Sequence, residues 1–596
     1  MLNARSRIFL REIALLARIA TVVALVFALA GALVLGTAQP ANALAFINID
    51  GHVYYPGGTQ PAPGVCIILR AAPDQCLSTD RTTDAQGFWT VGQTFPIVGN
   101  QSIWYVLSGY VIGHDTIPGS QTTDYHGNFT LVANPGTPPP PVACTNAANP
   151  TSTVYLPNIT RRLGGPNGWD TPFYVQNAGS ATTTIESSFY FFDTGGFATC
   201  HAHTNVAPGA SVLDDPNAAT DLLDGKQYSV VVCSYGSAAV AAVNQAQTTA
   251  AGALEALSYS GFNGGATTVY VPNVTRRFFG YDVPLIVQNL GVSSATITAT
   301  FTSFDGTQTV NIPLTVGSGR SGVIDPDFTS GLIDGTQYAV KLVSSQPIGV
   351  VANAHDEAIG PVAFSHNGLA AGAGTIYAPY ATKSASSFSP VVVQNVGSST
   401  TSATLTFTPL GGGAAQTFTV SNIPAGGAQA FDVRFPNGVA LPNTPVCTVG
   451  SSSCLAYGNY SLVITSPGLV AAVVLPNSNT TAAGYLAAVG PTSKVVLPVI
   501  HRNMGGWNDP IYLQSVGASS ATLQYYVIGA GTLAATQTQP LTSGTGLKID
   551  PATVAGLADG QQYSVVITGN GPLTAIVDEL NPATGDGTMI YEGFAR

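Results

Sequence analysis

One unit recurs four times along this 596-residue chain, and no other feature of the sequence constrains the fold as strongly. Each copy opens on a strand-like segment that ends in proline. A second apolar segment follows and ends, 15 to 19 residues after that proline, in Gln-Asn-x-Gly or Gln-Ser-x-Gly. The openings are TVYLP at 153–157, TVYVP at 268–272, TIYAP at 375–379 and KVVLP at 494–498, and the segment ends lie at 176–179, 288–291, 394–397 and 514–517. Matches at corresponding offsets, about 105 to 120 residues apart, indicate a tandem array of one structural unit.

A third block keeps the same period in three of the copies. Asp-Pro is followed nine residues later by Asp-Gly and then by tyrosine, at 215–228, 325–338 and 550–563, whereas the third copy lacks Asp-Pro and keeps Tyr460. Asp is a preferred N-cap, Pro suits the first helical position and Gly suits the position after the last turn. The block therefore predicts a short helix of about two turns.

The composition agrees with short strands joined by tight turns. Glycine (66) and proline (40) are abundant, hydrophobic residues make up 45% of the chain and charged residues only 8%. This balance argues against coiled coils and basic nucleic-acid binders, and it is too apolar for wholesale disorder. The predicted fold class is all-β: a tandem array of antiparallel β-sandwich (Ig-like) domains behind an N-terminal signal segment.

The chain divides into seven predicted segments. They are a signal peptide or N-terminal anchor (1–45), a small β-sandwich (46–133), a Pro-rich linker (134–150), repeat 1 (151–266), repeat 2 (267–373), repeat 3 (374–491) and repeat 4 (492–596). The linker contains the run PGTPPPP at 135–141, which favours an extended polyproline-type spacer.

The N-terminal segment predicts export. Arg5, Arg7, Arg11 and Arg18 precede an apolar run at 19–35, and small residues at 41–45 offer two A-x-A cleavage points. An uncleaved anchor is the alternative, because the run approaches the ~20 residues that span a bilayer. The protein is therefore expected to be secreted or at the cell surface. Its net charge is −11, which makes nucleic acid an unfavourable partner.

Seven cysteines in an exported chain favour disulfides. The spacing suggests the pairs Cys66–Cys76, Cys200–Cys233 and Cys447–Cys454, and it leaves Cys144 over. Spacing alone does not fix connectivity, so these pairs are expectations.

Residues 46–133 do not follow the repeat. They carry GHVYY at 51–55, PGVCIIL at 63–69 and TDAQGFW at 83–89. This progression resembles the carboxypeptidase-regulatory-like (transthyretin-like) domains of bacterial surface proteins, and the resemblance implies a non-catalytic accessory module. Asp84 and Gly87 are then most simply read as a turn that closes a hairpin. The four repeats resemble the tandem Ig-like units of uncharacterised bacterial secreted and surface proteins, which implies no known activity.

Catalytic motifs are not found in the sequence. It contains no G-x-S-x-G, no Walker loop and no H-E-x-x-H, and Glu255, Glu357 and Glu579 lie in different loops rather than as paired carboxylates. The Pro, Gln and Gly that recur in the copies are interpreted as turn and sheet construction. No catalytic residue, cofactor or metal site is predicted, and the chain is not expected to be an enzyme. His201 and His203 share one face of a strand, but two ligands do not make a metal site, so an exposed strand face is preferred.

Basic and aromatic residues gather in the loop after each opening strand. The candidate ligand contacts are Arg161, Arg162 and Trp169 in repeat 1, Arg276, Arg277 and Tyr281 in repeat 2, and Arg502 and Trp507 in repeat 4. Such residues on Gly-rich loops suit stacking on sugar rings and binding of acidic groups. The alternative, and the preferred interpretation, is that the aromatic ring plugs the open end of the sandwich and Arg pairs with an Asp of a neighbouring repeat.

These observations lead to two hypotheses of function. The first is a non-enzymatic exported structural or adhesion-type protein of the cell surface or extracellular matrix, with its domains in series as a rod. The alternative is a carbohydrate-binding array or an accessory subunit of a secreted hydrolase. The expected partners are cell-wall or extracellular glycans or other surface proteins. A membrane is a partner only if the N-terminal segment stays uncleaved.

Overall fold

The structure is a computed structural model. It describes residues 46–596 apart from 56–60, 70–79, 92–94, 97–100, 108–109, 112, 118–123, 134–143, 145–148, 250–251, 357–361, 441–443, 449 and 584. The predictions for the signal segment, for Cys76 and for the proline run fall outside the described residues. The described part of the chain is built almost entirely of strands, which confirms the all-β tandem sandwich fold. It holds no helix of the length and apolarity that a bilayer-spanning segment requires.

The N-terminal unit is small and packs its sheets around one core. Its strands are β1 (Phe46–Ile47), β2 (Ile49–Tyr54), β3 (Cys66–Ile68), β4 (Arg81–Thr82), β5 (Phe88–Thr90), β6 (Phe95–Pro96), β7 (Gln101–Val106), β8 (Tyr110–Val111), β9 (Gly113–Ile117), β10 (Tyr125–Thr130) and β11 (Val132–Ala133). One sheet runs β10-β2-β5 and another β4-β3-β7-β9, with Val53, Trp89 and Tyr105 between them. Asp84 accepts hydrogen bonds from the N–H groups of Gln86 (2.9 Å) and Phe88 (2.8 Å), as a hairpin turn requires.

Repeat 1 shows the plan of the recurring unit. Its strands are β12 (Ser152–Arg161), β13 (Phe173–Asn177), β14 (Thr183–Phe191), β15 (Phe197–Val206), β16 (Ser211–Asp214), β17 (Lys226–Tyr235), β18 (Ala239–Thr248) and β19 (Leu254–Ser260). They form two antiparallel sheets, β12-β17-β14-β15 and β16-β13-β18-β19. Leu156, Phe173, Phe189, Tyr228 and Tyr259 fill the core between them. This is the sandwich that alternating β-branched and aromatic residues predict.

Repeats 2, 3 and 4 follow the same plan. Repeat 2 has β20 (Ala266–Arg276), β21 (Tyr281–Asp282), β22 (Leu285–Asn289), β23 (Ala295–Ser303), β24 (Thr309–Val316), β25 (Ser321–Ile324), β26 (Thr336–Asp356) and β27 (Ala363–Asn367). Repeat 3 has β28 (Ala373–Lys383), β29 (Ser387–Phe388), β30 (Val391–Asn395), β31 (Thr401–Pro409), β32 (Gln416–Ile423), β33 (Ala428–Phe431), the 3-10 turn η1 (Pro436–Gly438), β34 (Gly458–Val474), β35 (Asn477–Ser478) and β36 (Tyr485–Leu486). Repeat 4 has β37 (Thr492–Arg502), β38 (Ile511–Ser515), β39 (Ser520–Val527), β40 (Leu533–Pro540), β41 (Gly546–Ile549), the 3-10 turn η2 (Pro551–Thr553), β42 (Gln561–Leu580), β43 (Thr588–Glu592) and β44 (Phe594–Ala595). In these repeats one long strand (β26, β34 or β42) serves both sheets, whereas a turn at Gly236 divides it into β17 and β18 in repeat 1.

The recurrent proline marks a bulge in each opening strand. The register against the partner strand shifts between Leu156 and Ile159 in repeat 1, and at the corresponding point in the other three repeats. Proline has no N–H to donate to a ladder, so it is tolerated where the pairing is interrupted. The recurrence of this proline is therefore explained by sheet construction, as predicted.

The predicted two-turn helix is wrong in length, although its cap is right. In repeat 4 the block forms the single 3-10 turn η2, and Asp550 accepts a hydrogen bond from Ala552 N at 3.0 Å. The recurrent tyrosine holds the loop that follows this turn, because Tyr563 OH accepts the N–H of Ala558 at 2.7 Å. Tyr228 and Tyr338 do the same in repeats 1 and 2. The loop is thus held by a buried side chain and needs no second helical turn.

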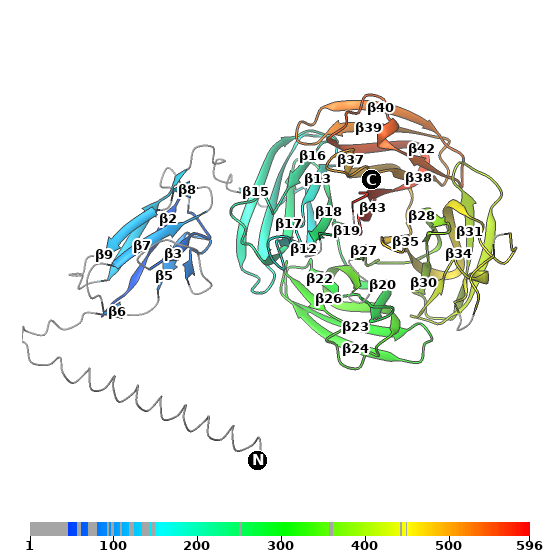
Figure 1. Cartoon of the computed structure of the whole chain (residues 1–596), viewed down its shortest axis with the longest axis horizontal. Coiled ribbons are helices and arrows are strands. Elements are labelled where there is room, and N and C mark those ends of the chain that lie inside the picture. The colour runs from blue at the N-terminus through cyan, green and yellow to red at the C-terminus, as the bar shows by residue number, and fades with distance from the viewer. Residues whose placement is uncertain are drawn as a thin grey trace, which may run out of the picture.

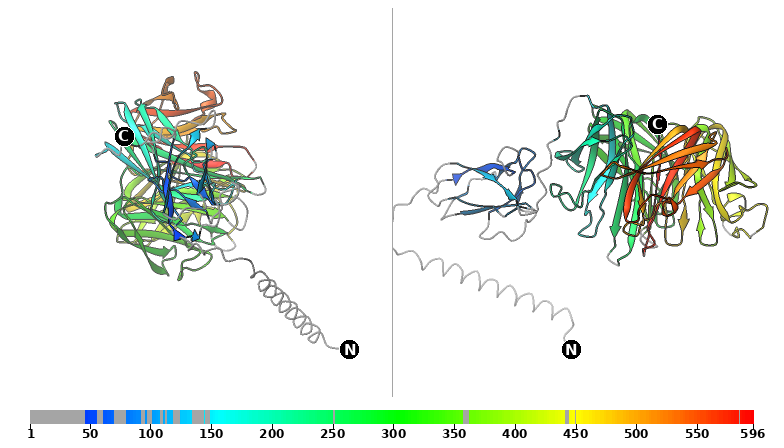
Figure 2. Two further views of the ribbon diagram at one scale, coloured as in Figure 1. Left: turned by 90° about the vertical axis from the view of Figure 1, so that its left-hand side faces the viewer. Right: turned by 90° about the horizontal axis from the view of Figure 1, so that it is seen from above.

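The four repeats close into a ring, and the expected rod is wrong. Consecutive repeats contact one another through β12 and β22, β20 and β30, and β28 and β38, and repeat 4 contacts repeat 1 through β37 with β13 and β18. Figure 1 shows this ring, and Figure 2 shows it edge-on. β19, β27 and β43 lie on its inner side (Figure 1), where β19 contacts both β27 and β43, and β36 contacts β27 and β43. One strand from each repeat therefore lies at the ring axis, namely β19, β27, β36 and β43.

Candidate functional site

The recurrent glutamine joins each repeat to its neighbour. The four side-chain amides are buried, and each donates to a backbone carbonyl two residues beyond the recurrent tyrosine of the preceding repeat, with repeat 4 preceding repeat 1. The pairs are Gln176 with Val565 O (3.3 Å), Gln288 with Val230 O (3.4 Å), Gln394 with Val340 O (3.3 Å) and Gln514 with Leu462 O (3.3 Å). The residue that the sequence analysis assigned to sheet construction within a repeat also builds the interfaces between repeats.

Asp586 connects repeat 4 to each of the other three repeats at the ring axis. Its Oδ2 accepts the N–H groups of Ala363 in repeat 2 (3.0 Å) and Ala482 in repeat 3 (3.1 Å), and its own N–H donates to Leu254 O in repeat 1 (2.7 Å). Burial raises the pKa of this carboxyl to about 8, although the backbone N–H groups act in the opposite direction. The protonated form therefore predominates at neutral pH.

Glu592 makes a second connection across the axis. Its Oε1 accepts the N–H of Leu486 in repeat 3 at 2.7 Å, and its Oε2 accepts the hydroxyl of Ser260 in repeat 1 at 3.0 Å. Burial raises the pKa of this carboxyl as well. Together Asp586 and Glu592 connect all four repeats through hydrogen bonds on the inner side of the ring.

The arginines of the predicted ligand loops pair within their own repeats. Arg161 and Arg162 contact Asp224 at 2.7 and 3.0 Å, and Arg502 contacts Asp559 at 2.9 Å. Arg276 and Arg277 likewise contact Asp334 of repeat 2, at 2.7 and 3.0 Å. The expected pairing with an Asp of a neighbouring repeat is therefore wrong. These aspartates belong to the recurrent Asp-Gly turns, whose glycines have positive φ values of 70 to 74°.

The aromatic residues of the same loops are half-buried. Trp169 meets His355 of repeat 2 edge-to-face at 5.2 Å between ring centroids, Trp507 lies 6.3 Å from His501, and Tyr281 lies 5.6 Å from Phe364. Neither tryptophan is part of a buried core cluster. The rings therefore cover the edges of repeats, and contact with a ligand stays a prediction.

One predicted disulfide is wrong. Cys200 is joined to Cys144, with 5.9 Å between their Cα atoms, and Cys233 is a free thiol. β14 lies between β15, which carries Cys200, and β17, which carries Cys233. Two strands of separation is roughly 9.5 Å, beyond the ~7 Å limit for Cα atoms of a disulfide. Cys447 and Cys454 are joined as predicted, and Cys66 is also disulfide-bonded.

His201 and His203 share one strand face, as expected, and that face is occupied by carboxylates. Asp214 Oδ1 lies 3.1 Å from His201 Nδ1 and 3.0 Å from His203 Nε2, and Asp221 lies 3.3 Å from His201 Nε2. The face is largely covered rather than exposed, because Asp214 and Asp221 are buried around the two rings. The arrangement is a charged hydrogen-bond network inside repeat 1.

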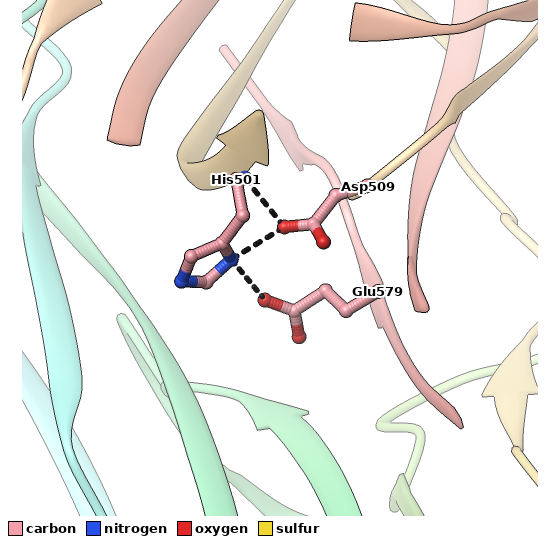
Figure 3. A group of neighbouring side chains, drawn as sticks. All are labelled: His501, Asp509 and Glu579. Carbon is pink, nitrogen blue, oxygen red and sulfur yellow. Dashed lines mark hydrogen bonds and ion pairs between the residues drawn. The ribbon is translucent and has the colours of Figure 1, made fainter. Parts of the chain in front are cut away.

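A buried group of His501, Asp509 and Glu579 faces repeat 1 from repeat 4 (Figure 3). His501 is the penultimate residue of β37, Asp509 precedes β38 and Glu579 lies near the end of β42. His501 Nδ1 is 2.6 Å from Asp509 Oδ2 and 3.8 Å from Glu579 Oε1. Both carboxylates are fully buried, and Asn244 of repeat 1 donates to Glu579 Oε1 at 2.7 Å.

The electrostatics of this group are unusual. Burial raises the pKa of Glu579 well above its ordinary value, and the charge of Asp509 adds to the effect. Burial also raises the pKa of Asp509, although His501 opposes the shift. Among the described residues, Asp509 Oδ1, Glu579 Oε2 and Asn244 Oδ1 are buried and accept no hydrogen bond. Two acids and an amide thus have buried oxygens to which no described residue donates, and this group is the candidate functional site.

This group was not predicted from the sequence, because Glu579 follows Asp509 only after 70 residues and no motif connects the two carboxylates along the chain. A signal was present in the repeat alignment. Where repeat 4 has His501 and Asp509, repeat 1 has Thr160 and Thr171, and the backbone contact is the same: Thr160 N donates to Thr171 Oγ1 at 3.0 Å, and His501 N donates to Asp509 Oδ2 at 2.6 Å. A departure from the repeat pattern therefore marks the site.

No protein-family model matches the sequence, and no curated protein matches it. Several solved structures resemble it weakly. The Bacillus anthracis TIE protein is 10% identical over 55% of this chain and 48% of its own, so the match spans about half of that protein, with a TM-score of 0.12. BcpA, the major pilin subunit of Bacillus cereus, is 10% identical over 52% of this chain and 87% of its own, with a TM-score of 0.12. The RrgB pilus protein of Streptococcus pneumoniae is 9% identical over 93% and 94%, with a TM-score of 0.15. Likenesses of this size do not indicate what this chain does.

Proposed function

We propose that this chain is a non-enzymatic, exported structural or adhesion-type protein of the cell surface or extracellular matrix, in which the four repeats form a rigid ring-shaped head. The observation that carries the proposal is ring closure by one recurrent buried contact. The same glutamine joins every neighbouring pair of repeats, and the recurrent prolines, tyrosines and arginines hold the framework. A chain whose recurrent residues build the fold and the interfaces between repeats suits a structural role.

The proposal is tested with the chain expressed in cells that process export signals. The protein is expected in the medium or on intact cells, where added protease removes it, and immobilised protein is expected to retain cells or matrix. Screens with glycoside, ester and peptide substrates are expected to give no turnover. Retention inside the cell, or turnover that disappears with one substitution, would contradict the proposal.

The carbohydrate-binding alternative has one observation in its favour. Trp169 and Trp507 are half-buried beside Gly-rich loops, so part of each ring is free to stack on a sugar. A glycan array with the full chain tests it. Specific binding that is lost in Trp169→Ala or Trp507→Ala, but kept in a variant of the exposed Leu533, would support this second function. Retention of cells without glycan binding favours the first.

A further inference from the structure

We propose that His501, Asp509 and Glu579 bind one divalent transition-metal ion, with Zn²⁺ as the test case, and that this ion fastens repeat 4 to repeat 1. The three potential ligand atoms all lie within 4.8 Å of one another. Ligands around a metal with bonds near 2.1 Å lie about 3 to 3.4 Å apart, so a bound ion would bring Glu579 Oε1 nearer to His501 Nδ1 than its 3.8 Å and would move Asp509 Oδ2 away from its 2.6 Å contact. The proposal is independent of the role of the whole chain at the cell surface.

The donor set selects the class of ion. One imidazole nitrogen with two carboxylates suits zinc, manganese or iron, whereas magnesium and calcium take oxygen ligands alone. Asn244 adds an amide beside Glu579, and its Oδ1 accepts no hydrogen bond among the described residues. The amide nitrogen faces Glu579 Oε1 in the structure, and a turn of the amide would present Oδ1 there as a fourth, neutral oxygen donor.

The buried oxygens give an independent reason for a cation. Asp509 Oδ1 and Glu579 Oε2 are enclosed and accept no hydrogen bond among the described residues. Two buried carboxylates beside one imidazole leave negative charge uncompensated when all three are ionised, and a buried unpaired charge is strongly unfavourable. A single divalent ion compensates both carboxylates.

The surroundings of His501 can adapt to metal binding. Gln562 Nε2 lies 2.8 Å from His501 Nε2 and donates to Tyr174 OH of repeat 1 at 2.6 Å. With metal on Nδ1 the imidazole proton moves to Nε2, and a turn of the Gln562 amide presents its oxygen to both His501 Nε2–H and the Tyr174 hydroxyl. Such an outer hydrogen bond fixes the orientation of a metal-binding histidine.

The site belongs to one interface of the ring. Glu579 is hydrogen-bonded by Asn244, and His501 connects through Gln562 to Tyr174, so both connections lead from repeat 4 to repeat 1. At the corresponding positions repeat 1 has Thr160, Thr171 and Gln245. These three side chains give the matched control, because repeat 1 folds with them.

The experiment compares the full chain with His501→Thr/Asp509→Thr/Glu579→Gln. Both proteins are unfolded in urea with chelator, refolded with Zn²⁺, Mn²⁺, Ca²⁺ or no metal, and dialysed. The metal content is then measured by mass spectrometry and the urea midpoint by tryptophan fluorescence. The wild type is expected to retain one Zn²⁺ or Mn²⁺ per chain and no Ca²⁺, with a higher midpoint than without metal. The triple variant is expected to retain none and to show no metal-dependent shift.

Three results would overturn the proposal. They are a wild type that retains no transition metal after refolding, equal retention by the triple variant, and retention without a change in the midpoint. His203→Asn provides a separate check, because it alters the histidine and carboxylate group of repeat 1. It is expected to leave the metal content unchanged, and loss of metal in this variant would place the ion in repeat 1 instead.

Discussion

His201 keeps its proton to a much higher pH than an ordinary histidine. Burial alone would lower its pKa, but hydrogen bonds to Asp214 and Asp221 outweigh burial and raise the pKa to about 10. His203 shares Asp214, and the pKa of that aspartate is held below its usual range. The network stabilises the charged form of the imidazole inside a folded β-sandwich.

Stability is therefore expected to fall as the pH rises from 6.5 to 10. A group whose pKa is higher in the folded state contributes fully below its unfolded pKa, here about 6.5, and contributes nothing above its folded pKa. The expected decline is roughly 2 to 4 kcal/mol, because each pKa unit corresponds to about 1.4 kcal/mol and the coupling to Asp214 is shared. Urea unfolding of the full chain at pH 6, 8 and 10 measures it.

Variants at two histidines separate this effect from general alkaline unfolding. His201→Asn should reduce the decline between pH 8 and 10, above the raised pKa of Asp586, whatever it does to the stability at pH 6. His114→Asn, at an exposed histidine of the N-terminal unit, should keep the wild-type slope. Equal slopes for wild type and His201→Asn would show that the network does not set the pH dependence.

Single residues show where sequence reasoning succeeds and where it stops. The bond between Cys447 and Cys454 was predictable, because the two residues lie seven positions apart and a short loop limits the choice. The bond between Cys144 and Cys200 was not, because it depends on which strands of a sheet are neighbours. The contacts of His501 likewise depend on which strands are neighbours. Its substitution for a recurrent threonine is visible in the alignment, but its carboxylate partners become neighbours only through the pairing of β37 with β42 and the loop before β38.

At the level of elements, the loops after the opening strands combine arginines that are paired with aspartates and aromatic rings that are partly exposed. The arginines are engaged with the Asp-Gly turns of their own repeats, and the tryptophans lie half-buried beside glycines. The recurring strand, bulge and turn were predictable because each depends on residues close in sequence. The length of the turn at Asp550 was not, because the side chain of Tyr563 supplies the hydrogen bond that a longer helix would have provided, and the spacing does not show where that side chain points.

Replacement of Trp169 by Ala should cost less than replacement of a core aromatic residue. Trp169 is half-buried and makes one edge-to-face contact with His355, so the expected loss is about 1 to 2 kcal/mol, whereas loss of a fully buried aromatic costs about 3 to 5 kcal/mol. Phe189→Ala in the same repeat is the control, since Phe189 is fully buried. Urea unfolding compares the two. A loss for Trp169→Ala as large as that for Phe189→Ala would favour the plug over a surface role.

The closed ring is the property of the whole molecule that the sequence analysis did not predict. Period and fold follow from patterns within one repeat, but a rod and a ring differ only in the angle between neighbouring repeats. That angle depends on contacts such as Gln288 with Val230 O, which recur identically around the ring. Along the ring axis, residues found in one repeat alone also connect the repeats. Asp586 binds backbone groups of repeats 2 and 3, and its own N–H binds repeat 1.

Asp586→Ala is therefore expected to open the ring, whereas Asp586→Asn should keep it closed. Alanine leaves the buried N–H groups of Ala363 and Ala482 without an acceptor, at about 1 to 3 kcal/mol each. Asparagine keeps a neutral carbonyl oxygen for both, and it resembles the protonated carboxyl that the raised pKa favours at pH 7. Small-angle scattering of residues 46–596 should show a larger radius of gyration for the alanine variant alone, because sandwiches about 40 Å long then extend in series.

Asp305→Ala, in an exposed turn of repeat 2, is the control and should match the wild type. An unchanged radius in Asp586→Ala would show that the glutamine contacts and Glu592 close the ring without this aspartate, and expansion in both Asp586 variants would show that closure depends on the ionised carboxylate.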